Sequence, residues 1–343
     1  MDRPGGPQAV RGGGTALVGA PVPATGRYAL QGVQLRAGVE LWAARAGARL
    51  LIEDDRSSPR RAAEVHARLI ARRCAFVLGP YGGDCMRAVA RVGGGVVLWN
   101  HGAAADDVQR LHGVVSVCSP ASRYLVALAR AVVALRLGAR VVIVTARGPF
   151  GRLAREGLER EARSLGVSIA ASFSFADTPE RIAAVGADAV LACGPFEREL
   201  GLFRALRSRA PQALLGGVSP GLSAFPARLG QDPEGLMAVA QWHPGLGADP
   251  RLGPPSSEVV GAARARGVQL DYVGAQAYAA ALIAARSHEL APDDPRAAAS
   301  MLRTTTFYGS FDLDAVTGIQ QGHMLCVVRW RGGRHELLPA DAA

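Results

Sequence analysis

The sequence predicts an α/β fold with two doubly wound, Rossmann-like lobes and a central cleft. The chain has 343 residues, more than the roughly 250–300 at which a single core stops growing. Short apolar runs bounded by Gly and Pro alternate with segments of helical periodicity, as in parallel sheets with helices between the strands. This alternation begins afresh after Ser119-Pro120, which predicts a second lobe.

The expected elements of the first lobe alternate between strand and helix. They are strand 15–20, helix 28–46, strand 50–52, a helix starting at Pro59, strand 75–78, a short helix, strand 96–99 and strand 114–117. Four consecutive apolar residues ending at Gly or Pro are typical of strands that are covered on both faces, so we expect this sheet to be parallel.

The second lobe repeats the pattern. Its expected elements are strand 140–145, helix 151–165, strands 167–173 and 187–192, helix 197–209, a strand around 214–215 and strand 236–240. A Gly- and Pro-rich segment over 241–255 is expected to return to the first lobe, where a long helix has Asp271 as its N-cap. The chain is expected to end with the segment 306–311 and a strand over 324–330.

These elements predict a division in which the chain crosses between lobes three times. Residues 1–14 form a lead-in, lobe 1 comprises 15–118 and 245–318, and lobe 2 comprises 119–244 and 319–343. The crossings are expected near Ser119, near 241–244 and near 318–321.

Composition excludes several classes of protein. The formal net charge is +10 and every cationic residue is Arg, but these residues are spread over the helices without a long run, so we expect no nucleic-acid partner. No apolar run approaches the ~20 residues of a membrane helix, so membrane insertion is not expected. The N-terminus lacks a secretory pattern. Either an export segment is missing from this sequence or the protein stays inside the cell; we expect a monomer.

The five cysteines are odd in number and show no CxxC spacing, which argues against a metal site and favours free thiols. A P-loop is excluded because the chain has no Lys, and no HExxH motif occurs. The carboxylate pairs at 54–55, 106–107 and 293–294 have no evident catalytic partner. We therefore predict a protein without a cofactor or metal and without enzymatic activity, the alternative being a hydrolase or dehydrogenase.

Two turns follow neighbouring strands of the first lobe, Gly79-Pro80-Tyr81-Gly82-Gly83-Asp84 and Asn100-His101-Gly102-Ala103. The carboxyl edge of an open α/β sheet binds ligands, because loop amides and helix N-termini converge there. Amides of these glycines suit a carboxylate or carbonyl oxygen. Asp84 is either a helix N-cap or a ligand contact. His101 either meets a ligand and responds to pH near neutrality or is bonded to a neighbouring loop.

These turns, with Ser119-Pro120-Ala121-Ser122-Arg123-Tyr124, resemble the substrate-binding proteins of branched-chain amino acid and amide ABC transporters, the type I periplasmic binding proteins. The resemblance implies a small-molecule ligand in the cleft, hinge closure, an ABC permease as partner and an extracytoplasmic location. A cytoplasmic ligand sensor of the same fold is the alternative. The resemblance places ligand contacts at Tyr81, Gly82, Gly83, His101, Gly102, Ala103, Tyr124, Phe150, Pro195, Phe196 and Ser219.

The sequence departs from this family in the second lobe. Phe150 and Phe196 stand where family members often have a phenol, which keeps an aromatic face but removes a hydroxyl. The loop 217–222 lacks the Glu that usually meets the ligand ammonium. Unless Glu197 or another carboxylate compensates, a buried ammonium would stay unpaired. We therefore expect a carboxylate- or amide-bearing ligand, aliphatic or aromatic, to bind better than a free branched-chain amino acid.

Overall fold

The computed structural model describes residues 16–93 and 95–339, so the lead-in expected over 1–14 and residue 15 of the first expected strand lie outside the described residues. The chain divides into two compact units. Unit 1 comprises the described residues up to Ser119 and Leu246–Met324, and unit 2 comprises Pro120–Gly245 and the described residues from Leu325. The segment 319–324, which the sequence assigned to the second lobe, lies in unit 1, where the Gln320 amide donates to Gln109 Oε1 at 3.1 Å.

Unit 1 contains parallel strands. They are β1 (Leu17–Val22), β2 (Arg49–Asp54), β3 (Phe76–Val77), β4 (Leu98–Asn100) and β5 (Val114–Ser116). The order β2-β1-β3 forms one sheet and β4-β5 another, and a parallel bridge between Leu78 and Trp99 connects the two. A separate antiparallel hairpin is formed by β11 (Thr304–Thr306) and β12 (Gly309–Phe311). The sequence predicted the strands but not this hairpin.

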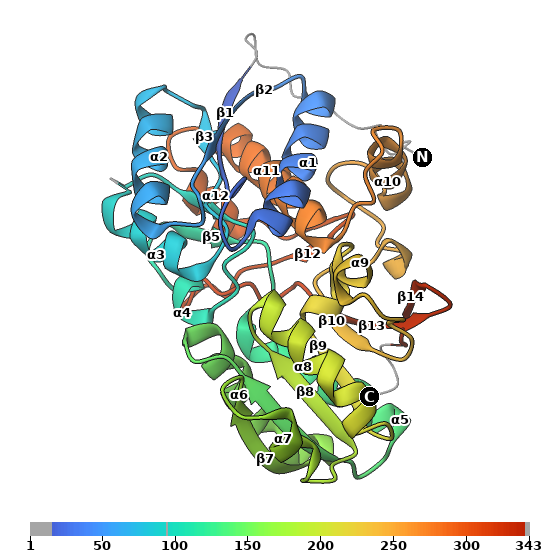
Figure 1. Cartoon of the computed structure of the whole chain (residues 1–343). Coiled ribbons are helices and arrows are strands. Elements are labelled where there is room, and N and C mark those ends of the chain that lie inside the picture. The colour runs from blue at the N-terminus through green and yellow to red at the C-terminus, as the bar shows by residue number, and fades with distance from the viewer. Residues whose placement is uncertain (1–15, 94, 340–343) are drawn as a thin grey trace, which may run out of the picture. The chain divides into compact units, whose positions relative to one another are not determined.

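Helices cover both faces of the unit 1 strands. They are α1 (Ala29–Ala46), α2 (Pro59–Ala71), α3 (Gly83–Val92), α4 (Asp106–Gln109), α10 (Ser256–Arg264), α11 (Tyr272–Leu290) and α12 (Pro295–Met301). Figure 1 shows α1 and α11 on one side of the strands and α2 and α3 on the other. Asp271 is the N-cap of α11, as predicted, and its carboxylate accepts from the Val273 amide at 2.9 Å.

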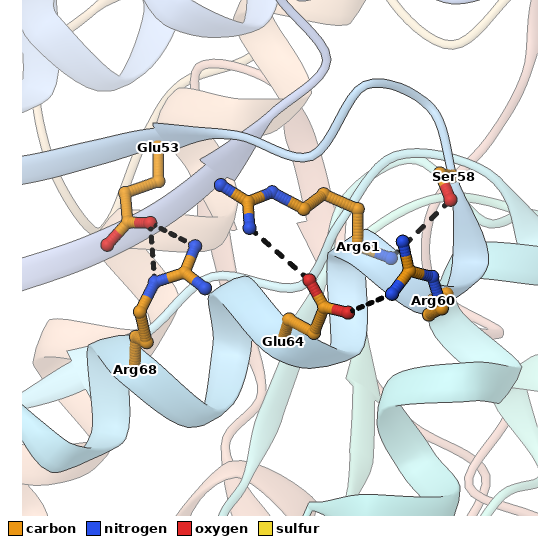
Figure 2. Close-up of polar contacts among 6 residues, drawn as sticks. All are labelled: Glu53, Ser58, Arg60, Arg61, Glu64 and Arg68. Carbon is orange, nitrogen blue, oxygen red and sulfur yellow. Dashed lines mark hydrogen bonds and ion pairs between the residues drawn. The ribbon is translucent and has the colours of Figure 1, made fainter.

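Helix α2 begins at Pro59, as predicted, and Ser58 is its N-cap. Its polar face carries ion pairs, as Figure 2 shows: Glu64 meets Arg60 and Arg61, and Arg68 donates to Glu53 of β2. The opposite face buries Val65 and Leu69 against Val77 of β3. The arrangement follows the sequence, because the apolar residues recur at helical spacing and the charged residues fill the solvent side.

Unit 2 has one sheet of order β14-β13-β10-β9-β8-β6-β7. Its strands are β6 (Arg140–Thr145), β7 (Ser168–Ser174), β8 (Ala189–Cys193), β9 (Leu214–Gly217), β10 (Met237–Ala240), β13 (Cys326–Arg331) and β14 (Arg334–Leu337). Strands β6 to β10 are parallel, whereas β13 pairs antiparallel with both β10 and β14. The sequence did not predict β14, which is the edge strand of a hairpin.

The helices of unit 2 also lie on both faces of the sheet. They are η1 (Ala121–Arg123), α5 (Tyr124–Leu135), α6 (Pro149–Leu165), α7 (Pro179–Ala183), α8 (Phe196–Arg209), η2 (Ser219–Gly221) and α9 (Phe225–Leu229). Helix α5 packs with α6, and α8 packs with α7 and α9. Figure 1 shows α8 in front of the sheet. The short η3 (Pro244–Leu246) spans the boundary between the units. Each unit is thus an α/β layer structure, as predicted.

Two further findings bear on the sequence predictions. All five cysteines are free thiols, four of them buried. Within the described part of the chain, no helix combines the length and apolarity needed to cross a membrane.

Candidate functional site

The carboxyl edge of unit 1 is shaped by the start of α3. Gly82 is the N-cap of this helix with φ of 93°, a left-handed conformation that glycine adopts readily. No side chain caps the helix, and helix geometry leaves the amides of Gly83, Asp84 and Cys85 without intrahelical acceptors. Asp84 is therefore not the N-cap; it lies in the first turn and pairs with Arg27 and Arg87 at 3.1 and 3.2 Å.

Most of the other expected amide donors already have acceptors. The Gly82 amide donates to the Gly102 carbonyl at 3.3 Å. The Asn100 side chain accepts from the Gly102 amide at 3.2 Å and from the Ala103 amide at 2.9 Å. The Gly83 amide is the first in α3, where helix geometry provides no intrahelical acceptor. The first turn of α3 is therefore the part of this edge that is suited to a ligand oxygen.

Two tyrosine rings cover this edge. Tyr81 and Tyr28 meet edge to face with centroids 5.1 Å apart. A Cβ added at Gly82 would touch the Tyr28 ring, and one added at Gly102 would overlap the Tyr81 ring. The two glycines thus let both rings lie flat against the turns. Burial raises the pKa of Tyr81, so its hydroxyl stays protonated and can donate.

His101 is not a surface contact. Its ring is fully buried, and its Nε2 lies 2.9 Å from the Gly79 carbonyl. Because a carbonyl only accepts, Nε2 carries the proton and donates. Burial lowers the pKa of His101 to about 4. Of the two alternatives that the sequence left open, the structure therefore matches a histidine bonded to a neighbouring loop.

In unit 2, the structure brings Tyr124 and Phe150 together. Their rings meet edge to face with centroids 5.2 Å apart at the starts of α5 and α6. Tyr124 is buried, and its hydroxyl accepts from the Gln241 side chain at 2.6 Å. Phe150 is half-buried. These residues form one aromatic surface at the carboxyl end of β6.

Phe196 packs inside unit 2. Its ring is buried and packs edge to face on Phe225, with centroids 6.1 Å apart. It is the first residue of α8 and shares a helical face with Leu200 and Phe203, so the ring points into the core of unit 2. Pro195 before it is exposed and is the N-cap.

Glu199 lies beneath the loops that follow β8 and β9. Its carboxylate is fully buried and accepts from the amides of Gly194, Val218 and Ser219 at 2.8, 3.0 and 2.7 Å. Burial raises its pKa to about 7, although these hydrogen bonds lower it. Glu197, two residues earlier, is exposed and pairs with Arg228 at 2.6 Å. Both nearby carboxylates therefore have partners already.

Ser219 lies in a Gly-Val-Ser-Pro-Gly segment over 217–221, which has GxSxG spacing. Sequence reasoning missed this motif. In hydrolases this spacing places the Ser at a strained, exposed turn. Here Ser219 is buried, and the described residues with positive φ other than glycine are Arg56, Ser57 and Arg73. The segment therefore lacks the geometry of a nucleophile turn.

Comparisons with known proteins identify the family to which this chain belongs. The family model described as periplasmic binding protein matches residues 15–332. The chain belongs to this family. Its members are non-enzymatic solute binders, so the periplasmic binding protein resemblance and the prediction of no enzymatic activity are confirmed. A search of curated protein sequences found no significant match.

Solved structures of the same fold cover nearly all of this periplasmic binding protein. The leucine binding protein LivK from Thermotoga maritima is 18% identical with a TM-score of 0.82, covering 95% of this chain and 98% of that one. A solute binding protein of an ABC transporter from R. palustris, in complex with 4-hydroxybenzoate, is 19% identical with a TM-score of 0.78, covering 94% and 95%. LivJ from Streptococcus pneumoniae, in complex with isoleucine, is 16% identical with a TM-score of 0.78, covering 95% and 99%.

Sequence reasoning missed two residues of the candidate site. Tyr28 follows the turn after β1. Because turns after parallel strands lie at the carboxyl edge of the sheet, its place in the sequence was enough to predict it as a site residue. Glu199 is the second of these residues. It stands three residues after Phe196 and four before Phe203, and an acidic residue on an apolar helical face is the signal that was available.

Proposed function

We propose that this periplasmic binding protein captures a small organic acid that lacks an α-ammonium group and delivers it to an ABC permease from an extracytoplasmic location. Each unit has, at the carboxyl edge of its strands, groups that suit one part of such a ligand. The amides at the start of α3 and the hydroxyls of Tyr28 and Tyr81 suit its carboxylate or an amide oxygen. The Tyr124 and Phe150 rings suit an aliphatic or aromatic body.

One observation carries this choice of ligand. Glu199 is committed to three backbone amides and Glu197 to Arg228, so neither is available to an ammonium group. Burying an ammonium without a partner costs several kcal/mol. The solved structures of the same fold include proteins in complex with 4-hydroxybenzoate and with benzoate, which supports an aromatic acid as one candidate.

Titration calorimetry with leucine, its deaminated counterpart 4-methylpentanoate, and benzoate tests this proposal. We expect at least one of the two acids to bind about tenfold or more tightly than leucine, which corresponds to about 1.4 kcal/mol. Leucine binding more tightly than both acids would contradict the ligand class. Absence of binding by all three would contradict the proposed function.

Gly102→Ala tests the role of Tyr81. The added methyl group would overlap the Tyr81 ring and displace it from the edge. We expect the affinity for the bound acid to fall about tenfold, with a loss of about 1–3 kcal/mol in the free energy of unfolding from overpacking. Gly201→Ala is the matched control, because a methyl group there meets no atom within 4 Å. Unchanged affinity in the Gly102 variant would place the ligand away from Tyr81.

A further inference from the structure

The buried carboxylate of Glu199 joins two loops that are far apart in the sequence. Gly194 follows β8, whereas Val218 and Ser219 follow β9, the neighbouring strand of the sheet. The Gly194 amide donates to Oε1, and the Val218 and Ser219 amides donate to Oε2. Each oxygen thus holds one loop, and a single side chain sets the spacing between them.

The groups around this carboxylate are neutral. The Cys193 thiol faces it from β8, the Ser219 hydroxyl from η2, the Gly217 backbone from β9 and the Phe203 ring from α8. Among the described residues, no cation lies within ion-pair distance of Glu199. The three backbone amides and the Ser219 hydroxyl therefore compensate its charge, so the stability of the charged form depends on the position of the two loops.

We propose that Glu199 is a positioning residue for ligand binding, because it holds the loops after β8 and β9 in one arrangement. This inference rests on the proposed function, since those loops carry Pro195 and Ser219, which the family resemblance predicts to contact the ligand. Glu199 itself is fully buried and acts through the loops rather than on the ligand.

Protonation would weaken this hold. An ionised carboxylate accepts at both oxygens, whereas a protonated carboxyl carries a hydrogen on one of them, which opposes an amide N–H. Burial raises the pKa of Glu199 to about 7. The hydrogen bonds from both loops are therefore complete above neutral pH, and those to one loop are lost as the pH falls through 7. Ligand affinity should fall over the same pH range.

Amide NMR on the unliganded protein tests the hold on the loops without any ligand. We expect the Gly194, Val218 and Ser219 amide resonances to shift with one common midpoint near pH 7 in a titration from pH 5.5 to 8.5. This midpoint should vanish in Glu199→Gln and persist in Glu197→Gln, the exposed control on the same helix. Absence of a common midpoint in the unmodified protein would overturn the inference.

Binding of benzoate and 4-methylpentanoate tests the consequence for function, because both probes stay ionised between pH 6 and 8. We expect the unmodified protein to bind about tenfold more weakly at pH 6 than at pH 8. Glu199→Gln should bind about tenfold more weakly at pH 8 and show little dependence on pH, whereas Glu197→Gln should match the unmodified protein. The role of Glu199 would be overturned if Glu199→Gln bound the acids within twofold of the unmodified protein at pH 8. It would also be overturned if the affinity of Glu199→Gln changed with pH as that of the unmodified protein does.

Gly217→Ala is a second variant in case Glu199→Gln does not fold. A methyl group there would lie 2.7 Å from Glu199 Oε2 and from the Phe203 ring, so it displaces the carboxylate without removing it. In this variant we expect smaller pH-dependent shifts of the three amide resonances and weaker binding of the acids at pH 8. Shifts and affinities equal to those of the unmodified protein would contradict the inference. If neither probe binds the unmodified protein, the proposed function fails, while the amide titration still decides whether Glu199 holds the loops.

Discussion

Gly38→Ala is expected to lower the free energy of unfolding by about 3 kcal/mol or more, enough to consume a large part of the stability of a typical domain. Gly38 lies on α1 where this helix crosses α11. A Cβ there would overlap the Gly274 carbonyl oxygen and lie 2.8 Å from its carbon, and a Cβ on Gly274 would lie 2.9 Å from the Gln34 carbonyl oxygen. Because the obstacle is backbone, no side chain can rotate away, and the helices themselves must separate.

Separation of α1 and α11 would also break side-chain hydrogen bonds between the segments. Gln34 Nε2 donates to the Gln269 carbonyl at 2.9 Å, and Gln34 Oε1 accepts from the Asp271 amide at 3.0 Å. Urea unfolding followed by circular dichroism measures the loss. Gly261→Ala, on α10 where nothing lies within 4 Å, is the control and should gain up to about 1 kcal/mol from higher helix propensity. A Gly38 variant within 1 kcal/mol of the unmodified protein would contradict this packing.

The fold was predictable where the chain obeys a local period. The strand expected over 140–145 is β6 at the same residues, and the capping residues before α2 and α11 follow from local chemistry. Strand β14 and the β11–β12 hairpin were missed because their residues alternate weakly, and each is stabilised by pairing with a neighbour. The close approach at Gly38 is equally invisible, since its partner Gly274 lies 236 positions away.

The candidate site was predictable as a location but not as a set of contacts. Strand-end turns identified the edge that carries Tyr81 and Gly83. Whether a turn residue faces solvent or core depends on other strands: His101 is buried because the Gly79 carbonyl lies beside it, and the Gly102 amide is occupied because Asn100 folds back. Phe196 is the exception, since its spacing from Leu200 and Phe203 already placed it on a buried helical face.

His66→Leu is expected to stabilise the protein, and more so in acid. His66 lies on α2 with 1% of its surface exposed, and neither ring nitrogen has a hydrogen-bond partner among the residues that the structure describes. A buried donor or acceptor without a partner costs about 1–3 kcal/mol. Leu has a similar volume and no polar atom, so we expect a gain of about that size at pH 7.

The gain should widen as the pH falls. Burial lowers the pKa of His66 to about 4, against 6.5 in the unfolded chain, so the unfolded state takes up the proton first and the unmodified protein loses stability from pH 6.5 toward pH 4. At pH 5 this linkage adds about 2 kcal/mol to the advantage of the Leu variant. Other buried titratable groups, including His101, remain in both proteins and cancel in the difference. Urea unfolding at pH 5, 6 and 7 measures the difference in free energy of unfolding between the two proteins. The exposed His112→Gln variant is the control. A difference that stays constant with pH would mean that His66 is already charged or solvated in the folded protein.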